Sequence, residues 1–132
     1  RRAAHAWKKI ISLGQDKNGE RHYGEDAEEY AREAKKLPIR IMTAGLGQSL
    51  AFILAKANKK PKLKCLLDDL TDWIVNGRRI GCKVQNSLME SISQGDVDFL
   101  RQATDEVLAY LNWLNRFAEA EGLGDGQSND SN

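Results

Sequence analysis

The chain has 132 residues and a formal net charge of +1, with 41% hydrophobic and 30% charged residues. This composition excludes an intrinsically disordered chain, and no apolar run reaches the roughly 18 uncharged residues that a membrane-spanning helix needs. A chain of this length is expected to form one domain with its own hydrophobic core, and we assign residues 1–121 to a single helical domain.

Helical periodicity runs through almost the whole chain, and no pair of alternating runs is joined by a tight turn, so we predict an all-α fold. The first helix is predicted over Ala3–Leu13, and a polar loop that contains three glycines follows over residues 14–24. A second helix is predicted over Glu25–Lys36. Pro38 is expected to break this helix and to open the next one, because proline has no amide hydrogen to donate within a helix.

The helix predicted over Pro38–Ala57 is apolar on nearly every side, and such helices are buried in a core or between subunits. We therefore expect it at the centre of the domain, with one inward stripe made of Ile39, Met42, Leu46, Leu50 and Ile53. A glycine inside a helix costs about 1 kcal/mol relative to alanine, so Gly45 and Gly47 are expected to allow close packing of the backbone. Gln48 would then be a buried polar residue that needs a hydrogen-bond partner.

A fourth helix is predicted over Lys62–Val75 and is expected to end at Asn76-Gly77, since both residues tolerate the left-handed conformation that ends helices. Its apolar residues recur at helical spacing: Leu63, Leu66, Leu67, Leu70 and Ile74. A loop over residues 77–83 and a short helix over about residues 84–94 are expected to follow.

The last helix is predicted over Val97–Glu121, with Asp96 as its N-terminal cap. Its core stripe is Leu100, Ala103, Val107, Leu111, Leu114 and Ala118, and an aromatic edge of Tyr110, Trp113 and Phe117 lies beside it. The opposite, solvated face is predicted to carry Arg101, Asp105, Asn112, Arg116 and Glu119. Residues 122–132 have no periodicity and are predicted to form a disordered tail. The predicted fold is thus a compact bundle of five or six helices with a disordered C-terminal tail.

The sequence offers no convincing catalytic or metal site. The run Asp68-Asp69-Leu70-Thr71-Asp72 matches the diphosphate-binding motif of all-helical isoprenoid synthases, but those enzymes are much longer and need a second acidic cluster, so we interpret it as a solvated polar face. Gly45-Leu46-Gly47 lacks the Gly-Lys-Ser/Thr that completes a phosphate-binding loop. The two histidines, His5 and His22, have no ligands at metal spacing. We therefore predict neither a catalytic residue nor a metal or cofactor.

The two cysteines, Cys65 and Cys82, have neither metal nor redox spacing, and no secretory signal is recognisable. We therefore expect a cytoplasmic protein.

The charges are divided unevenly along the chain. Residues 35–83 contain eleven basic and three acidic residues, whereas residues 84–132 contain two basic and nine acidic residues. Such asymmetry points to a nucleic-acid or protein partner. The candidate phosphate-binding residues are Arg40, Lys56, Lys59, Lys60, Lys62, Lys64, Arg78, Arg79 and Lys83. Because no aromatic residues are interleaved with the lysines, we expect binding to the nucleic-acid backbone without sequence preference.

Two motifs carry a resemblance to a known family. The first contains Pro38, Ile39, Gly45-Leu46-Gly47-Gln48, Leu50-Ala51-Phe52 and Lys56. The second is Tyr110-Leu111-Asn112-Trp113-Leu114 followed by Arg116-Phe117-Ala118-Glu119-Ala120, and a weaker match is Arg2-Ala3-Ala4 with Trp7. In this order and separation they resemble the Cmr small-subunit family, the small subunits of type III-B CRISPR RNA-guided effector complexes.

The resemblance implies a non-catalytic subunit of an antiviral ribonucleoprotein, whose copies stack into a short filament and help hold the guide RNA–target RNA duplex. Its partners would be other Cmr subunits, further copies of itself, guide RNA and target RNA, with no membrane contact. From the charges, we expect residues 35–83 to face RNA and the acidic residues 84–132 to meet basic neighbours. The packing or interface candidates are Gly45, Gly47, Gln48, Tyr110, Trp113 and Phe117. The alternative is a helical protein-interaction scaffold without direct RNA contact.

Overall fold

The computed structural model of the chain describes residues 1–77, 88, 92–93 and 97–124. Its helices are α1 (Arg2–Ser12), α2 (Glu25–Ala44), α3 (Leu46–Ala57), α4 (Lys62–Thr71), a π-helix η1 (Asp72–Gly77) and α6 (Val97–Ala120). The only strands among these residues are β1 (Gln15–Lys17) and β2 (Glu20–His22). The predicted all-α fold class is therefore confirmed.

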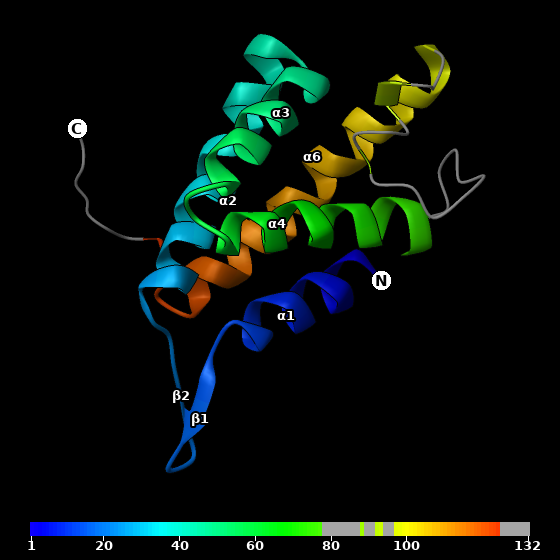
Figure 1. Cartoon of the computed structure of the whole chain (residues 1–132). Coiled ribbons are helices and arrows are strands. Elements are labelled where there is room, and N and C mark those ends of the chain that lie inside the picture. The colour runs from blue at the N-terminus through cyan, green and yellow to red at the C-terminus, as the bar shows by residue number, and fades with distance from the viewer. Residues whose placement is uncertain (78–87, 89–91, 94–96, 125–132) are drawn as a thin grey trace.

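The helices pack around one core. Helix α1 lies along α6, α2 crosses α6, and α3 and α4 pack against α2 (Figure 1). Tyr30 of α2, Leu66 of α4 and Tyr110 of α6 are fully buried where these helices meet. No helix among the described residues is both long enough and apolar enough to cross a membrane.

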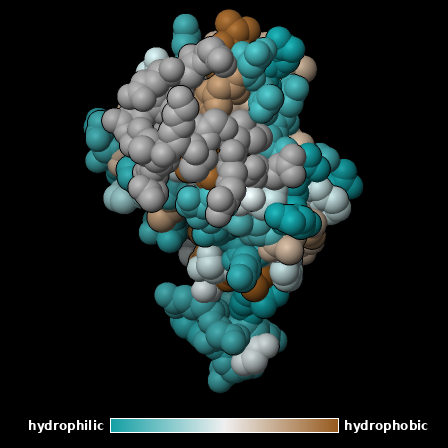
Figure 2. Space-filling view, turned by 90° about the vertical axis from the view of Figure 1, so that its right-hand side faces the viewer, coloured by the Kyte–Doolittle hydropathy of each residue, from teal (hydrophilic) through white to brown (hydrophobic). Residues whose placement is uncertain are grey.

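The predicted polar loop over residues 14–24 contains a β-hairpin, so the expectation of no strands there was wrong. Asn18 and Gly19 both have positive φ, +52° and +79°, as a two-residue type I′ turn requires. Gln15 pairs with His22 and Lys17 with Glu20 in antiparallel register. Both strands are exposed throughout, and the hairpin projects from the bundle as a hydrophilic arm (Figures 1 and 2).

Pro38 does not end a helix, because α2 runs through it from Glu25 to Ala44. Proline cannot donate a hydrogen bond to the carbonyl four residues earlier, which here belongs to Ala34. The side chain of Asn115, on α6, donates to that carbonyl instead, at 3.0 Å. The predicted break at Pro38 was therefore wrong because another helix supplies the missing donor.

The break falls at Gly45 instead, which divides the predicted helix Pro38–Ala57 between α2 and α3. Gly45 has φ +89°, and a Cβ added to it would meet nothing within 4 Å. Its role is therefore conformational, and the predicted close packing was wrong for this residue. A Cβ on Gly47 would lie 3.6 Å from the side chain of Ile92, which is an ordinary contact.

The predicted burial of residues 38–57 on nearly every side was wrong, because only one face is buried: Ile41 of α2 is buried, whereas Phe52 and Leu54 of α3 are 47% and 41% exposed. Leu46, Leu50 and Ile53 are buried as expected. Ile39 and Met42 are 73% and 77% exposed, because the two helices differ in direction and do not share one stripe. Gln48 is exposed rather than buried, so it needs no partner in the core.

The predicted stripe of α4 is confirmed, since Leu63, Leu66, Leu67, Leu70 and Ile74 are all buried. The helix continues as η1 to Gly77, where a Cβ would approach the Trp73 ring to 2.5 Å. In α6 the predicted stripe is buried except for Leu100, which is 40% exposed, and the predicted solvated face is exposed. Apart from Gly77, which ends η1, the predicted loop over residues 77–83 lies outside the described residues, as do the cap Asp96 and most of the helix over residues 84–94.

The first residues of the predicted tail pack onto the bundle. Gly122 has φ +76°, and the amide of Leu123 donates to the Ala118 carbonyl at 2.8 Å, which ends α6 in a Schellman motif. Leu123 is buried, and the amide of Gly124 donates to Glu28 on α2. The disorder predicted for residues 122–124 was wrong, and residues 125–132 lie outside the described residues.

Candidate nucleic-acid interface

Four of the candidate phosphate-binding lysines lie in and beside the turn between α3 and α4. Lys59, Lys60 and Lys64 are exposed and Lys62 is partly exposed. Backbone hydrogen bonds close the turn, from the Lys60 amide to the Lys56 carbonyl and from the Lys64 amide to the Pro61 carbonyl, each at 3.0 Å. We call residues 59–64 the basic turn. Its fixed backbone holds four ammonium groups at one end of two helices.

The ion pairs within the basic turn are weak. Lys60 lies 3.4 Å from Glu29, and Lys64 lies 3.4 Å from Asp68 one helical turn away. The side chains of both lysines are about half exposed, at 49% and 57%. The Lys64–Asp68 pair is exposed on both sides and such pairs contribute about 0–1 kcal/mol, whereas Glu29 of the Lys60 pair is 20% exposed. In both pairs the lysine side faces water, where a phosphate can approach it. The ammonium groups of the turn therefore remain available to an anionic ligand.

Arg40 and Lys56 are placed differently, because both bind Glu33. The Glu33 side chain is 6% exposed, and Arg40 lies 3.2 Å from one of its oxygens while Lys56 binds the other. Burial alone would raise the pKa of Glu33, but hydrogen bonds from Lys56 and Arg40 outweigh it and hold the pKa below its ordinary value. Both cations also lie over the Phe52 ring, with the Arg40 guanidinium at 4.3 Å from the ring centre.

These contacts join α2 to α3 on either side of Gly45. We call the set of Glu33, Arg40, Phe52 and Lys56 the Glu33 clamp. It explains how a carboxylate is tolerated at a buried position, since buried charges need partners. It also leaves less of the positive charge of Arg40 and Lys56 available to a ligand. The remaining candidates, Arg78, Arg79 and Lys83, lie outside the described residues.

The predicted aromatic edge of α6 is divided between core and surface. Tyr110 is fully buried, whereas Trp113 is 40% exposed and stacks on the partly buried Phe117 with ring centres 5.6 Å apart. The rings of Phe117 and of Trp7 on α1 pack in a T-shaped arrangement, with ring centres 5.3 Å apart. Of the interface candidates at this edge, Trp113 is the one with a large free face.

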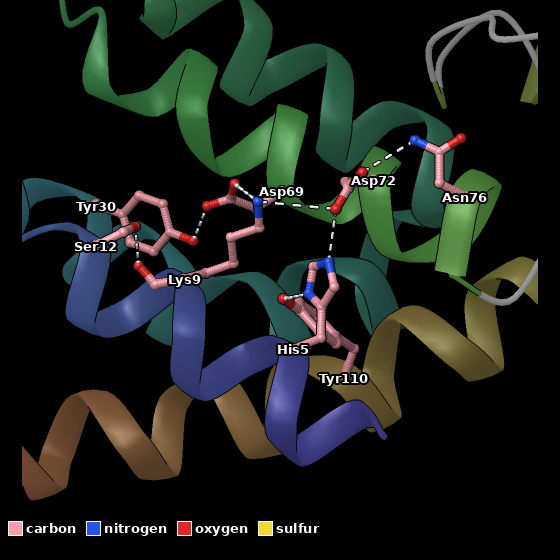
Figure 3. Close-up of polar contacts among 8 residues, drawn as sticks. All are labelled: His5, Lys9, Ser12, Tyr30, Asp69, Asp72, Asn76 and Tyr110. Carbon is pink, nitrogen blue, oxygen red and sulfur yellow. Dashed lines mark hydrogen bonds and ion pairs between the residues drawn. The ribbon is translucent and has the colours of Figure 1, made fainter.

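His5, which the sequence left isolated, lies in a polar network between α1, η1 and α6 (Figure 3). Its Nδ1 is 2.6 Å from the Tyr110 hydroxyl and its Nε2 is 2.7 Å from Asp72. Asn76 donates to the other Asp72 oxygen at 3.0 Å. The hydrogen bonds from Asn76 and His5 lower the pKa of Asp72.

Asp69 extends this network to α2 (Figure 3). The hydroxyl of Tyr30 donates to Asp69 at 2.6 Å, and Lys9 lies 3.6 Å away. Burial raises the pKa of Asp69, and it raises that of Tyr30 as well. The solvated face predicted for the Asp68–Asp72 run is confirmed only for Asp68, since Asp69 and Asp72 bind other helices. Among the described residues, no three potential metal ligands are grouped together.

Comparison with known proteins identifies the family. The model of the family described as CRISPR-associated protein (Cas_Cmr5) matches residues 1–121. The chain belongs to the Cas_Cmr5 family. The resemblance to the Cmr small-subunit family is thereby confirmed.

Two proteins agree with this Cas_Cmr5 assignment. The CRISPR system Cmr subunit Cmr5 of Thermus thermophilus is 34% identical over 97 residues, which are 74% of this chain and 78% of that protein. The crystal structure of a CRISPR-associated Cmr5 family protein, also from Thermus thermophilus, is similar with a TM-score of 0.66 and 29% sequence identity. That similarity covers 90% of this chain and 92% of the other.

The sequence analysis did not identify the two buried carboxylates, Glu33 and Glu106, that bind cationic side chains of this Cas_Cmr5 protein. Glu33 and Arg40 are seven residues apart and so share a face of α2, a spacing that is readable in the sequence. The pairing of Glu33 with Lys56 depends on the bend at Gly45. The buried Glu106, which binds both Arg2 and the Trp73 indole, gave no signal because its partners lie on other helices.

Proposed function

We propose that this chain is a non-catalytic small subunit of a type III-B CRISPR ribonucleoprotein effector in antiviral defence. In the cytoplasm it would bind other Cmr subunits and further copies of itself, and would help hold the guide RNA–target RNA duplex and the filament of the complex. Membership of the Cas_Cmr5 family supports this assignment, as does the relative that is named a Cmr subunit.

The observation that carries RNA contact is the basic turn. Its four lysines are weakly paired, and they lie at one end of two helices where a strand can approach. Flexible ammonium groups suit phosphate contact without base recognition, which matches a complex whose sequence recognition comes from base pairing. Arg78, Arg79 and Lys83 remain candidates for phosphate contact. We assign Arg40 and Lys56 first to the Glu33 clamp.

The subunit contacts are proposed on other surfaces. Gln48 of α3 is an exposed interface candidate. The exposed acidic residues of α6 include Asp98, Asp105 and Glu119, which suit basic surfaces of neighbouring subunits.

We propose that RNA cleavage belongs to other subunits. His5 is a poor candidate for a general base, because its two ring nitrogens face Tyr110 and Asp72 within the bundle and Tyr110 is fully buried. A turnover that is lost on replacing His5 or Asp72 by alanine in a folded variant would contradict this part of the proposal.

The second candidate function is a protein-interaction scaffold without RNA contact. It is favoured by large apolar side chains that no described residue covers, since Ile39, Met42 and Val97 are each more than 70% exposed. Ile39 and Met42 lie three residues apart on α2 and so are neighbours on its surface, as exposed apolar side chains of a protein interface are.

Affinity purification of the tagged chain from its native cell tests the assignment. We expect recovery with other effector subunits and a short guide RNA. A variant with glutamate at Lys59, Lys60, Lys62 and Lys64 should recover the same subunits while the complex retains less target RNA. Recovery of the wild-type chain alone would contradict membership of the complex, and unchanged RNA retention by the variant would favour the scaffold.

A further inference from the structure

A small hollow on the outer face of α6 has the chemistry of a nucleotide site. It measures about 180 Å³ and is lined by Asn112, Trp113 and Arg116. This is smaller than the roughly 300–1,000 Å³ clefts that hold drug-sized ligands, so it suits a single planar group. None of the basic-turn residues lines it.

The aromatic wall of this hollow is held in place before any ligand arrives. Trp113 is 40% exposed, and its ring is stacked on Phe117 with 5.6 Å between ring centres and 29° between ring planes. Phe117 itself packs against Trp7 of α1 in a T-shaped arrangement. A ring that is fixed in this way loses little conformational entropy on binding, and it leaves a free surface for a second ring.

The two polar residues of the hollow, Asn112 and Arg116, lie one helical turn apart on α6, in a stripe next to that of Trp113 and Phe117. Asn112 and Arg116 are both exposed, and among the described residues neither side chain has a hydrogen-bond or ion-pair partner. The amide of Asn112 can donate to and accept from the edge of a base. The guanidinium of Arg116 matches the geometry and charge of a phosphate.

We infer that this hollow binds one unpaired nucleotide of a single RNA strand, with the base stacked on Trp113 and the phosphate at Arg116. A nucleotide offers a partner to each of the three lining residues: the face of its base to Trp113, the edge of its base to Asn112 and its phosphate to Arg116. An apolar side chain of a protein partner would leave Asn112 and Arg116 unmatched, and an acidic side chain would leave the Trp113 ring unmatched. The inference rests on the proposed function, because it adds a base-contacting site to a chain that otherwise contacts the RNA backbone.

The test compares a single-stranded RNA of mixed sequence with an abasic ribose-phosphate strand of equal length. Binding to the purified chain, and to the effector complex from the native cell, is measured by filter binding at low salt. Trp113→Ala should weaken binding to the RNA by about 5- to 150-fold, the range that one lost stacking contact gives, and should leave binding to the abasic strand within about twofold. Trp113→Phe, which keeps a planar ring, should retain most of the affinity.

Two further variants sharpen the result. Arg116→Gln should lower the slope of log K against log salt by about 0.7, the value for one phosphate of a single strand. Met42→Ala removes another exposed apolar side chain and serves as the control, with no expected change. Circular dichroism of each variant checks that the bundle is folded.

The inference is overturned if Trp113→Ala changes neither strand's binding, or weakens both equally. It is also overturned if this variant loses co-purifying protein subunits while its RNA affinity is unchanged, since the hollow would then be a protein contact. In these cases wild-type binding to RNA persists and the proposed function survives. A wild-type chain that binds neither strand, alone or in the complex, contradicts both.

Discussion

The basic turn and the Glu33 clamp both contain cationic side chains, but these side chains differ in how far they and their partners are buried. Lys59, Lys60 and Lys64 of the turn are exposed, and the carboxylates beside Lys60 and Lys64 are 20% and 62% exposed. Arg40 and Lys56 of the clamp share a carboxylate that is almost fully buried. A cation beside a buried carboxylate stabilises the fold, whereas a cation in water is free to bind a ligand. Position along the chain does not separate these roles, since Lys56 and Lys59 are only three residues apart in the sequence.

Removing the charge of Glu33 is the strongest way to test this difference. Glu33→Gln should lower the free energy of unfolding by about 2 kcal/mol, because charged hydrogen bonds from Arg40 and Lys56 are lost at a buried position. The expected loss stays below the value for a fully buried pair because both cations are partly exposed. Urea unfolding measures it, with Asp68→Asn, at the exposed Lys64 pair, as the control. RNA affinity should change less than about twofold, and a large loss of affinity would place the clamp in the binding surface.

A second prediction concerns the hydrogen bond from the Asn115 side chain on α6 to the Ala34 carbonyl on α2. Asn115→Leu should cost about 1–2 kcal/mol, because the Ala34 carbonyl is left without a donor. Pro38→Ala restores an amide that can donate to the same carbonyl, so Asn115→Leu should cost less in that background. A double-mutant cycle by urea unfolding measures the coupling. Equal costs in the two backgrounds would show that Asn115 does not compensate for Pro38.

The clamp should also make stability depend on pH. The pKa of Glu33 is lowered on folding, so its contribution is fully present above the unfolded pKa, about 4.5, and is lost as the pH falls through the folded value. The difference in unfolding free energy between the wild type and Glu33→Gln should therefore be constant near pH 7 and shrink below about pH 4.5. A difference that is unchanged at about pH 3 would contradict a charged Glu33.

Replacing the lysines of the basic turn should have the smallest effect on stability. Glutamine at Lys59, Lys60, Lys62 and Lys64 is expected to change the unfolding free energy by only about 0.5 kcal/mol, as for surface substitutions elsewhere. Thermal unfolding beside the wild type checks this. A loss of several kcal/mol would mean that the turn, like the clamp, is part of the structural framework.

Local sequence patterns predicted the parts of the fold that depend on local spacing. The leucines of α4 recur at the helical period, and the polar face of α6 has no apolar residue to bury. The hairpin could also have been predicted, since Asn18-Gly19 is a strong turn signal. The path of α2 through Pro38 could not, because the compensating donor, Asn115, is 81 residues from Ala34.

The candidate site was predicted less well than the fold, for a physical reason. The sequence identified every lysine of the basic turn, but it could not separate them from Lys56, whose partner Glu33 is 23 residues away. A positive φ and close packing of the backbone both favour glycine, so the sequence alone could not show which of the two explains Gly45. The structure shows a positive φ there and no close packing. The hollow beside Trp113 depends on which side of α6 the other helices cover.

The salt dependence of RNA binding tests the central claim, that the basic turn contacts phosphates, most directly. For the wild-type chain or its complex, log K for single-stranded RNA should fall linearly with log salt. The glutamine variant at Lys59, Lys60, Lys62 and Lys64 should reduce this slope by about 2–3, at roughly 0.7 for each lost phosphate contact. If this variant and the wild type give the same slope and affinity, the basic turn does not bind RNA.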